Sequence, residues 1–176
     1  MTQLERTIRT SRATGIKADN LMEATMVAEL ISPSTDLWLV SPWISDVIAV
    51  DNSYGFYDDM FENPPNQLRL AATLGILSAR GCRVKIATRP DPHNDAFLDR
   101  VTSAGPEIQV AIDEGEWVHE KTFCGQNWII TGSMNFTLSG MERNDEHTTY
   151  RYGGGLPSQT RIDLSARWTE QLSVRD

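Results

Sequence analysis

The chain has 176 residues and a mass of 19.7 kDa; 40% of its residues are hydrophobic and 23% are charged. These values are typical of one globular domain, so we expect residues 1–176 to form a single domain. They exclude wholesale disorder and collagen-like repeats, and no apolar stretch approaches the roughly 20 residues that cross a bilayer. The formal net charge of −8 excludes an indiscriminate nucleic-acid coat, because such affinity comes mainly from cationic contacts with phosphates.

The first predicted elements are a helix and a buried strand. Apolar residues recur along one face of residues 18–31, which predicts a helix with Asp19 or Asn20 as its N-cap. The dense apolar run that starts at Asp36 and stops at Pro42 is typical of a strand buried on both faces.

A long loop is expected next. Residues 46–67 contain glycine, a Pro-Pro pair and several aromatic side chains, and they far exceed an ordinary connection in length. Their aromatic part, 54–61, would either gate a cleft or seal a subunit interface, and the sequence leaves both roles open.

Strands and helices then alternate along the chain. The predicted elements are a helix over 67–80, a strand over 82–88, a helix over 94–103 and a strand over 107–112. This order indicates right-handed crossovers that build a parallel sheet. We therefore expect an α/β fold, with a mostly parallel central sheet flanked by helices on both faces.

Three further features are expected to be structural. Cys82 and Cys124 lie in strand-like segments, which favours buried free thiols over a disulfide. The glycine run at 153–155 lacks the residues of a phosphate-binding loop and is expected to be a turn. The apolar spacing of residues 158–172 predicts a final helix.

The segment from Trp117 to Glu146 carries the chemistry. Residues 118–124 are predicted to form a strand, in which His119 and Lys121 would project to the same side. After a turn, a returning strand would end at the sequence Gly-Ser-Met-Asn of residues 132–135, close to that pair.

These residue types suit the cleavage of a phosphodiester. Lys121, Asn135 and Ser133 can bind the nonbridging oxygens, and donors aimed at developing charge are usually the largest catalytic contribution. His119 can attack phosphorus or protonate the leaving oxygen. Glu146, which begins a last strand, could fix the tautomer of that imidazole.

The pattern His119-x-Lys121 followed by Gly-Ser133-x-Asn135 resembles the HxK…GSxN motif of the phospholipase D superfamily, and Glu146 matches that family's later glutamate. The resemblance covers most of the chain and implies cleavage of phosphodiesters in lipids or nucleic acids. One departure is that Gln126 stands where the family has Asp, in a turn one residue shorter than usual. We expect this change to affect the geometry of the turn rather than the reaction.

The sequence holds only one copy of the motif. The family's chemistry requires two facing motifs, in which one histidine becomes a phosphohistidine and the other protonates the leaving group. The resemblance therefore implies a phospholipase-D-like half-fold that assembles as a homodimer, with His119 of each subunit in a shared cleft. It implies no cofactor, and the sequence shows no ligand spacing for a metal.

We therefore expect a metal-independent phosphodiesterase, a nuclease acting on DNA or RNA in the cytoplasm, because the start of the chain lacks the apolar core of a secretory signal. The acidic charge suggests low intrinsic affinity and a partner protein that delivers the substrate, as in defence or DNA-modification systems. Two alternatives remain: an inactive binding or scaffold subunit of such a system, and a phospholipid phosphodiesterase.

Other aromatic and histidine residues have weaker roles. Trp43 follows the first buried strand, where open α/β sheets place ligand contacts, and is kept as a substrate-binding candidate. Trp117 and Trp128 are expected in the core or at an interface. His93 is expected at the surface or as a cap, and His147 is expected to point away from Glu146.

Overall fold

A computed structural model describes residues 3–11, 13, 15, 17–115, 117–142 and 144–172. The helices among these residues are α1 (Asp19–Ile31), α2 (Leu70–Ala79), α3 (Pro92–Thr102), α4 (Leu138–Glu142) and α5 (Leu156–Trp168), with short 3-10 helices at Asp58–Met60 and Thr169–Gln171. The strands are β1 (Leu4–Arg9), β2 (Asp36–Val40), β3 (Ile48–Asp51), β4 (Gln67–Arg69), β5 (Arg83–Thr88), β6 (Ile108–Ile112), β7 (Thr122–Cys124), β8 (Trp128–Gly132) and β9 (His147–Tyr152).

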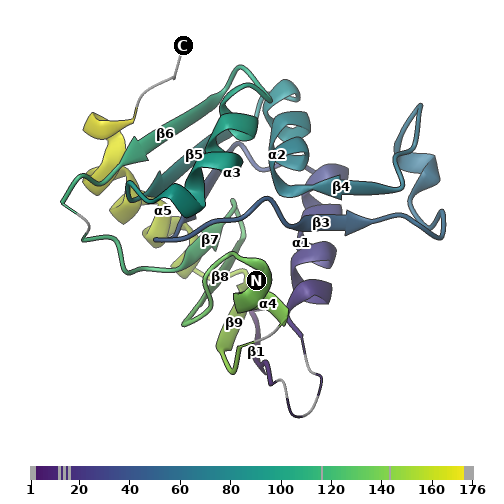
Figure 1. Ribbon diagram of the computed structural model, residues 1–176, viewed down its shortest axis with the longest axis horizontal. Helices are drawn as coiled ribbons and strands as arrows, with labels where there is room; N and C mark the ends of the chain where they lie inside the picture. Colours follow the sequence, from purple (N-terminus) through teal and green to yellow (C-terminus); the bar gives the residue numbers. More distant parts are fainter. Residues whose placement is uncertain are drawn as a thin grey trace.

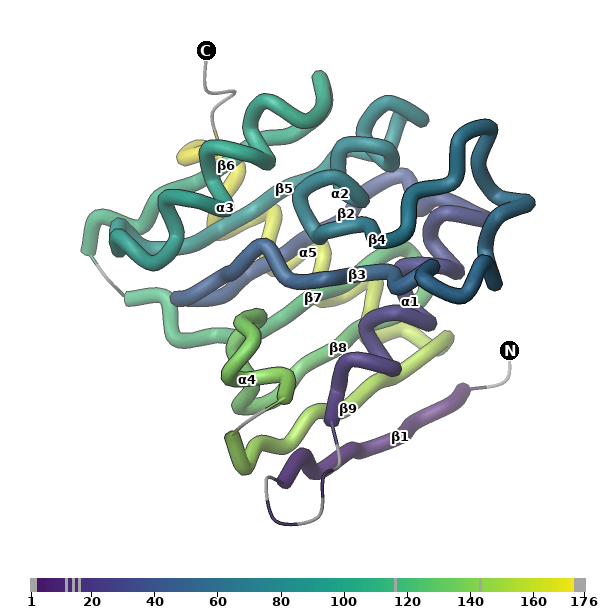
Figure 2. The backbone as a smooth tube through the Cα atoms, turned by 45° about the vertical axis from the view of Figure 1, so that its right-hand side comes forward, coloured from purple at the N-terminus to yellow at the C-terminus, as the bar shows by residue number. Residues whose placement is uncertain are grey.

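The described strands form a seven-stranded sheet in the order β1-β9-β8-β7-β2-β5-β6 and a separate pair, β3-β4. Helices α1, α2 and α3 cover one face of the large sheet and α5 covers the other (Figure 1, Figure 2). The predicted α/β fold is confirmed. The sheet is mixed rather than mostly parallel, because β2, β5 and β6 are parallel while β7, β8, β9 and β1 alternate in direction.

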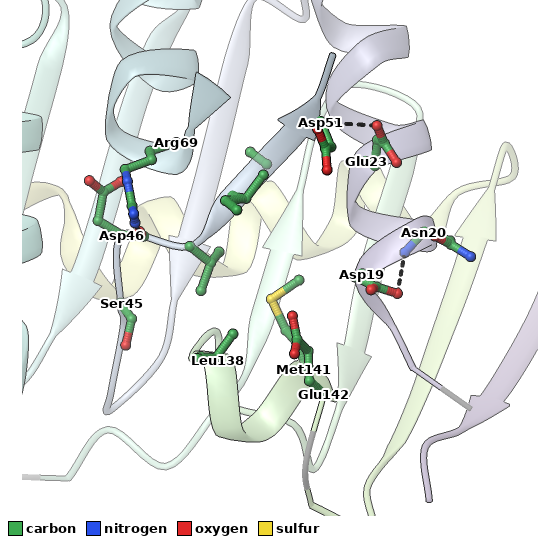
Figure 3. A pocket seen from close by; sticks show the side chains of 13 residues that line it. Asp19, Asn20, Glu23, Ser45, Asp46, Asp51, Arg69, Leu138, Met141 and Glu142 are labelled. Carbon is green, nitrogen blue, oxygen red and sulfur yellow. Dashed lines mark hydrogen bonds between the residues drawn. The ribbon is translucent and has the colours of Figure 1, made fainter. Parts of the chain in front are cut away.

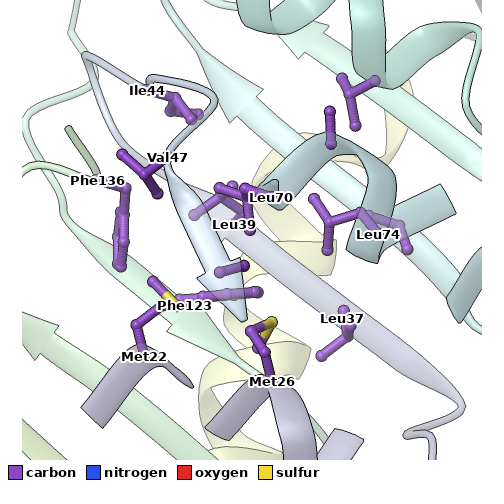
Figure 4. Packing of buried hydrophobic residues seen from close by; sticks show 14 of the residues in the cluster. Met22, Met26, Leu37, Leu39, Ile44, Val47, Leu70, Leu74, Phe123 and Phe136 are labelled. Carbon is purple, nitrogen blue, oxygen red and sulfur yellow. The ribbon is translucent and has the colours of Figure 1, made fainter. Parts of the chain in front are cut away.

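Alternate side chains of the central strands pack into two hydrophobic cores. The larger core lies under α1, α2 and α3, and Figure 4 shows its central side chains: Met22, Met26, Leu37, Leu39, Leu70, Leu74, Phe123 and Phe136. On the opposite face, Trp38 and Val40 of β2 pack with Leu164 of α5. Strand β2 is therefore buried on both faces, as its apolar run predicted.

A buried carboxylate ties α1 to the β7–β8 hairpin. Glu29, only 4% exposed, accepts hydrogen bonds from the backbone N–H and the hydroxyl of Ser34, both at 2.8 Å, and from Trp128 Nε1 at 2.6 Å. Ser34 Oγ in turn accepts the backbone N–H of Gln126 at 2.8 Å, and Arg161 donates to the carbonyl oxygens on the same turn. The shortened turn at Gln126 is thus held by long-range bonds.

The region between β2 and α2 differs from its prediction. Residues 67–69 are a strand paired with β3, and the helix begins only at Leu70. The reason is a cap from another segment: the carboxylate of Asp46 accepts the N–H of Ala71 at 2.9 Å, and Val47 O accepts the N–H of Leu70. The expected loop over 46–67 therefore contains the β3–β4 pair and a 3-10 helix.

The aromatic segment 54–61 forms the far end of this β3–β4 pair. Strand β3 runs back from the end of β2, so the segment projects on the side away from the carboxyl ends of β5 and β6 (Figure 1). Tyr54 and Phe56 are 83% and 78% exposed. Within one chain, the segment does not gate that edge of the sheet.

The helices agree with the sequence in position but differ at some ends. Ala18 occupies the N-cap position of α1, and neither Asp19 nor Asn20 caps the helix. In α5, Leu164 and Trp168 are buried, whereas Ile162 is 62% exposed. None of the described helices has both the length and the apolar character that crossing a membrane requires.

Cys82 and Cys124 are free and buried, which confirms the predicted thiols. Burial, as the main cause, raises the pKa of each thiol to about 12.

Because the thiolate is the reactive form, we expect neither cysteine to react with a disulfide reagent at pH 8 in the folded protein, and both to react after denaturation. A colorimetric thiol count with and without denaturant checks this; rapid labelling of the native protein would contradict it.

Candidate active site

Polar side chains gather at one edge of the large sheet. Strands β2, β5 and β6 end there because they are parallel, and the alternating directions of β7, β8 and β9 place the start of β7, the end of β8 and the start of β9 at the same edge. Across the sheet, the residues at this edge are, in order, Glu146, Ser133, Lys121, Ser41 and Arg89.

Lys121 lies in the middle of this row. Thr122 pairs with Val40 on one side and with Thr131 on the other, so the preceding Lys121 sits beside the ends of β2 and β8. Its ammonium donates to the carbonyl oxygen of His119. No ion pair with a carboxylate involves Lys121 within the described ranges. The pKa of Lys121 is lowered, first by burial and then by the charge of Arg89, against the opposing effect of Glu146.

Ser133 and Glu146 are bonded directly to each other. Ser133 Oγ donates to a carboxylate oxygen of Glu146 and accepts the backbone N–H of His147 at 3.1 Å. The backbone of Glu146 is held by Thr10, whose Oγ accepts its N–H at 3.0 Å and whose N–H donates to its carbonyl oxygen. Glu146 therefore supports the serine of the motif in this structure, rather than the imidazole.

Asn135 lies on the segment between β8 and α4, beside the segment that follows β2. Its Oδ1 accepts from Ser41 Oγ at 3.4 Å, and the neighbouring Phe136 forms a parallel bridge with Ile44. A Cβ on Gly140 would lie 2.3 Å from the carbonyl oxygen of Asn135, so only glycine allows the first turn of α4 to approach this closely. Asn135 is thereby fixed at the same sheet edge as Lys121.

His119 differs from its expected setting. The strand predicted over 118–124 begins only at Thr122, as β7. Val118 cannot join the sheet through its N–H, because that group donates to Asp113 Oδ2 at 2.7 Å. His119 is exposed, and its imidazole makes no hydrogen bond to any other described residue. The structure thus brings together Lys121, Ser133, Asn135 and Glu146, with the imidazole of His119 open to solvent.

The structure adds residues that the sequence did not single out. Asn94 is fully buried and links the ends of two strands: its Oδ1 accepts the N–H of Ile44 at 2.8 Å, and its Nδ2 donates to carbonyl oxygens of Pro42 and Arg89 at 3.0 Å. The signal for such a residue is weak, because its partners lie on separate segments of the chain.

The tryptophans divide into three settings. Trp128 is buried, as expected. Trp117 is 82% exposed and does not belong to the core of this chain. Trp43 is half-buried; its Nε1 donates to Asp91 at 2.8 Å, and the guanidinium of Arg89 lies 4.3 Å from its ring centre. A cation rather than open solvent therefore covers one face of the Trp43 ring.

A separate pocket of about 500 Å³ lies between α1, β3 and α4 (Figure 3). Its floor is apolar, and its lining includes the carboxylates of Asp19, Glu23, Asp46, Asp51 and Glu142. Arg69 also lines it. This concentration of negative charge disfavours a phosphate, so we place the candidate active site at the sheet edge rather than in this pocket.

Comparison with solved structures agrees with this architecture. Nuc, a phospholipase D family member from Salmonella typhimurium, is 15% identical with a TM-score of 0.64, and the match covers 98% of this chain and 99% of Nuc. NucT from Helicobacter pylori is 10% identical with a TM-score of 0.62, over 99% and 100% of the two chains. Polyphosphate kinase from Porphyromonas gingivalis is 15% identical with a TM-score of 0.58, over 92% of this chain and 25% of the kinase.

At the level of sequence, no curated protein matches significantly. The family described as "Cardiolipin synthase, PLD-like domain" matches residues 59–168, which is more than half of the chain and includes every residue of the motif. Membership supports a general phosphodiesterase role. With its fold and its motif in agreement, the chain belongs to the phospholipase-D-like family.

Proposed function

We propose that the protein is a metal-independent phosphodiesterase that cleaves nucleic acid, with an active site assembled from two copies of the chain. The observation that carries this proposal is the position of Lys121, a cation without an ion-pair partner among the described residues, beside Ser133 and Asn135 at one sheet edge. On a chain with a net charge of −8, an unneutralised ammonium among hydrogen-bond donors supports an anion site.

The proposed reaction has two steps. The imidazole of one His119 attacks phosphorus, a nitrogen–phosphorus bond forms, and the bond from phosphorus to the leaving oxygen breaks. The second His119 gives that oxygen its proton. This second imidazole then takes a proton from water, whose oxygen attacks phosphorus and releases the first histidine. Lys121 and Asn135 bind the nonbridging oxygens throughout, and Glu146 orients the hydroxyl of Ser133.

Two copies are proposed because one chain supplies one motif and leaves its imidazole exposed. A large apolar side chain two residues before His119, Trp117, is also exposed, and it lines the same hollow as His119. A twofold contact over this surface would cover Trp117 and bring the two imidazoles together. The same contact would concentrate two copies of Lys121 in one cleft.

Nucleic acid is proposed over phospholipid because the residues next to Lys121 along the sheet edge are polar or charged, and the exposed Trp117 would be covered in the proposed dimer. The acidic net charge further suggests that a partner protein, of the kind found in defence or DNA-modification systems, delivers the substrate. A second candidate is a binding subunit without turnover, which is favoured by the exposed His119 and by Gln126 in place of the family's Asp.

Replacing the nucleophile tests catalysis directly. We expect His119→Ala to lower the cleavage of labelled DNA or RNA by about 10³-fold or more in excess chelator, because the covalent step is lost. His93→Ala is the matched control, since His93 is an exposed histidine bonded to Ser45, and it should retain activity. Phosphatidylcholine is tested in parallel. Equal activity of His119→Ala and the unmodified protein on every substrate would contradict the proposal that the protein is an enzyme. Cleavage of the lipid alone would contradict the proposal that it is a nuclease.

Mixing subunits tests the shared site. If both His119 side chains are required, an equal mixture of unmodified and His119→Ala subunits, after exchange, should show about one quarter of the activity of the unmodified protein. Independent monomers would show about one half. Light scattering of the same samples should give a dimer, and a strict monomer would contradict the proposal.

The pH dependence of binding tests Lys121. Binding needs the charged ammonium of Lys121, which is lost as pH rises through its lowered pKa. The affinity of His119→Ala protein for an oligonucleotide should therefore fall at a lower pH than it would if Lys121 had the pKa of an ordinary lysine. Arg89→Ala removes a charge that lowers this pKa and should move the fall to higher pH. Glu146→Gln removes a charge that raises it and should move the fall to lower pH. Fluorescence anisotropy across pH measures the effect; coincident profiles would show that Lys121 does not bind phosphate.

A further inference from the structure

Arg89 is held in one position by its neighbours. It directly follows β5, and its carbonyl oxygen accepts from the buried Asn94 at 3.0 Å. Its guanidinium lies 4.3 Å from the ring centre of Trp43, a cation–π contact. The ring is itself fixed, because Trp43 Nε1 donates to Asp91 at 2.8 Å. Both the backbone and the charged end of Arg89 are therefore constrained.

Arg89 nevertheless forms no ion pair with a described carboxylate. Arg89 Nε is buried without a hydrogen-bond partner, and the guanidinium takes part in none of the ion pairs between described residues. Asp91 is nearby, but its oxygens bond to the backbone N–H of His93 and to Trp43 and not to the guanidinium. The hydrogen bond from His93 is the main cause that lowers the pKa of Asp91, and the charge of Arg89 adds a smaller effect. A buried donor left without a partner lowers stability, so its retention calls for another reason.

Some other arginines of this chain form ion pairs, and Arg69, Arg80 and Arg161 donate to backbone carbonyl oxygens instead. Arg83, at the opposite end of the same strand, pairs with Asp36 at 2.7 Å, and Arg100 pairs with Asp46 at 2.9 Å. The chain has 24 acidic residues to 16 basic ones, so carboxylates are plentiful. An arginine that pairs with no described carboxylate, beside a lysine that pairs with none, is suited to an anion from outside the chain.

The position of Arg89 distinguishes it from the residues around Lys121. Strand β5 is separated from β7 by β2, so the backbones of Arg89 and Lys121 are roughly 10 Å apart, at about 4.8 Å per strand. Ser133 lies on the β8 side of Lys121, away from Arg89, whereas Asn135 reaches the segment after β2 and bonds to Ser41. Because the guanidinium of Arg89 is held over the Trp43 ring, a phosphate bound by Lys121 and Asn135 leaves it for a second anion.

We propose that Arg89, supported by Trp43, binds the phosphate next to the one that is cleaved, so that the site selects a substrate with at least two consecutive phosphodiesters. This inference rests on the proposed function and names its substrate class, because a nucleic-acid strand presents phosphates in series, whereas a simple phospholipid has one diester. Trp43 is then a positioning residue, since one face of its ring is covered by the guanidinium.

Substrates of two lengths separate the roles of the two cations. A trinucleotide has two phosphodiesters and a dinucleoside monophosphate has one. We expect Arg89→Ala to raise KM for the trinucleotide about tenfold with little change in kcat, and to leave cleavage of the dinucleoside unchanged. Arg89→Lys keeps the charge and should recover most of the loss. Arg83→Ala, at the other end of β5, is the matched control and should behave like the unmodified protein.

Binding without turnover gives an independent measurement. In a His119→Ala background, the affinity for an oligothymidylate should depend on salt, and Arg89→Ala should reduce the slope of log K against log salt by about 0.7 per site, the value for one phosphate contact with a single strand. Circular dichroism melting of each variant verifies that it is folded.

A change in the substrate avoids any dependence on the folding of the variant. Replacing a phosphodiester next to the cleaved one with an uncharged methylphosphonate should reproduce the loss in the unmodified protein. An equal loss for Arg89→Ala on the dinucleoside would place Arg89 on the cleaved phosphate and overturn the inference, as would an unchanged salt slope or no effect of the methylphosphonate. A changed salt slope in a protein that cleaves nothing would reject the proposed function and retain the binding site.

Discussion

The buried carboxylate of Glu29 is the interaction on which the geometry of the candidate site depends. It joins α1 to β8 through Trp128 and to the turn at Gln126 through Ser34. These bonds hold the β7–β8 hairpin against the helical layer. Lys121 directly precedes β7 and Ser133 directly follows β8, so both lie at the open end of this hairpin. A carboxylate with three donors is satisfied without a cation, so the buried charge specifies one arrangement of the hairpin.

Several elements could be predicted because their signals are local. The buried strands β2, β5 and β6 appear as apolar runs, and the spacing of the motif indicates the β7–β8 hairpin, although β7 begins four residues later than predicted. Strand β1 gives no such signal: its side chains are mostly exposed, and it is a strand only because it pairs with β9, far along the chain. The short β3–β4 pair is similar, since each strand has just three or four residues and its partner lies across a long connection.

The candidate site was predictable to the same extent. Lys121, Ser133, Asn135 and Glu146 meet because the directions of the strands bring them to one edge, which the motif implied. Arg89 was not predictable, because its lack of an ion pair with a described carboxylate becomes evident only when Asp91 and Trp43 are placed in space. The exposure of His119 was also hidden, since the N–H of Val118 is taken by a side chain instead of a neighbouring strand.

The contact between Thr10 and Glu146 has a consequence for how the protein folds. The two residues are separated by 136 positions, and the backbone of Glu146 is fixed by the residue that follows β1, near the opposite end of the described chain. Closing so long a loop costs conformational entropy that local contacts cannot offset. Local opening of that outer edge would release the backbone of Glu146, and with it the support of Ser133, while the core remained intact.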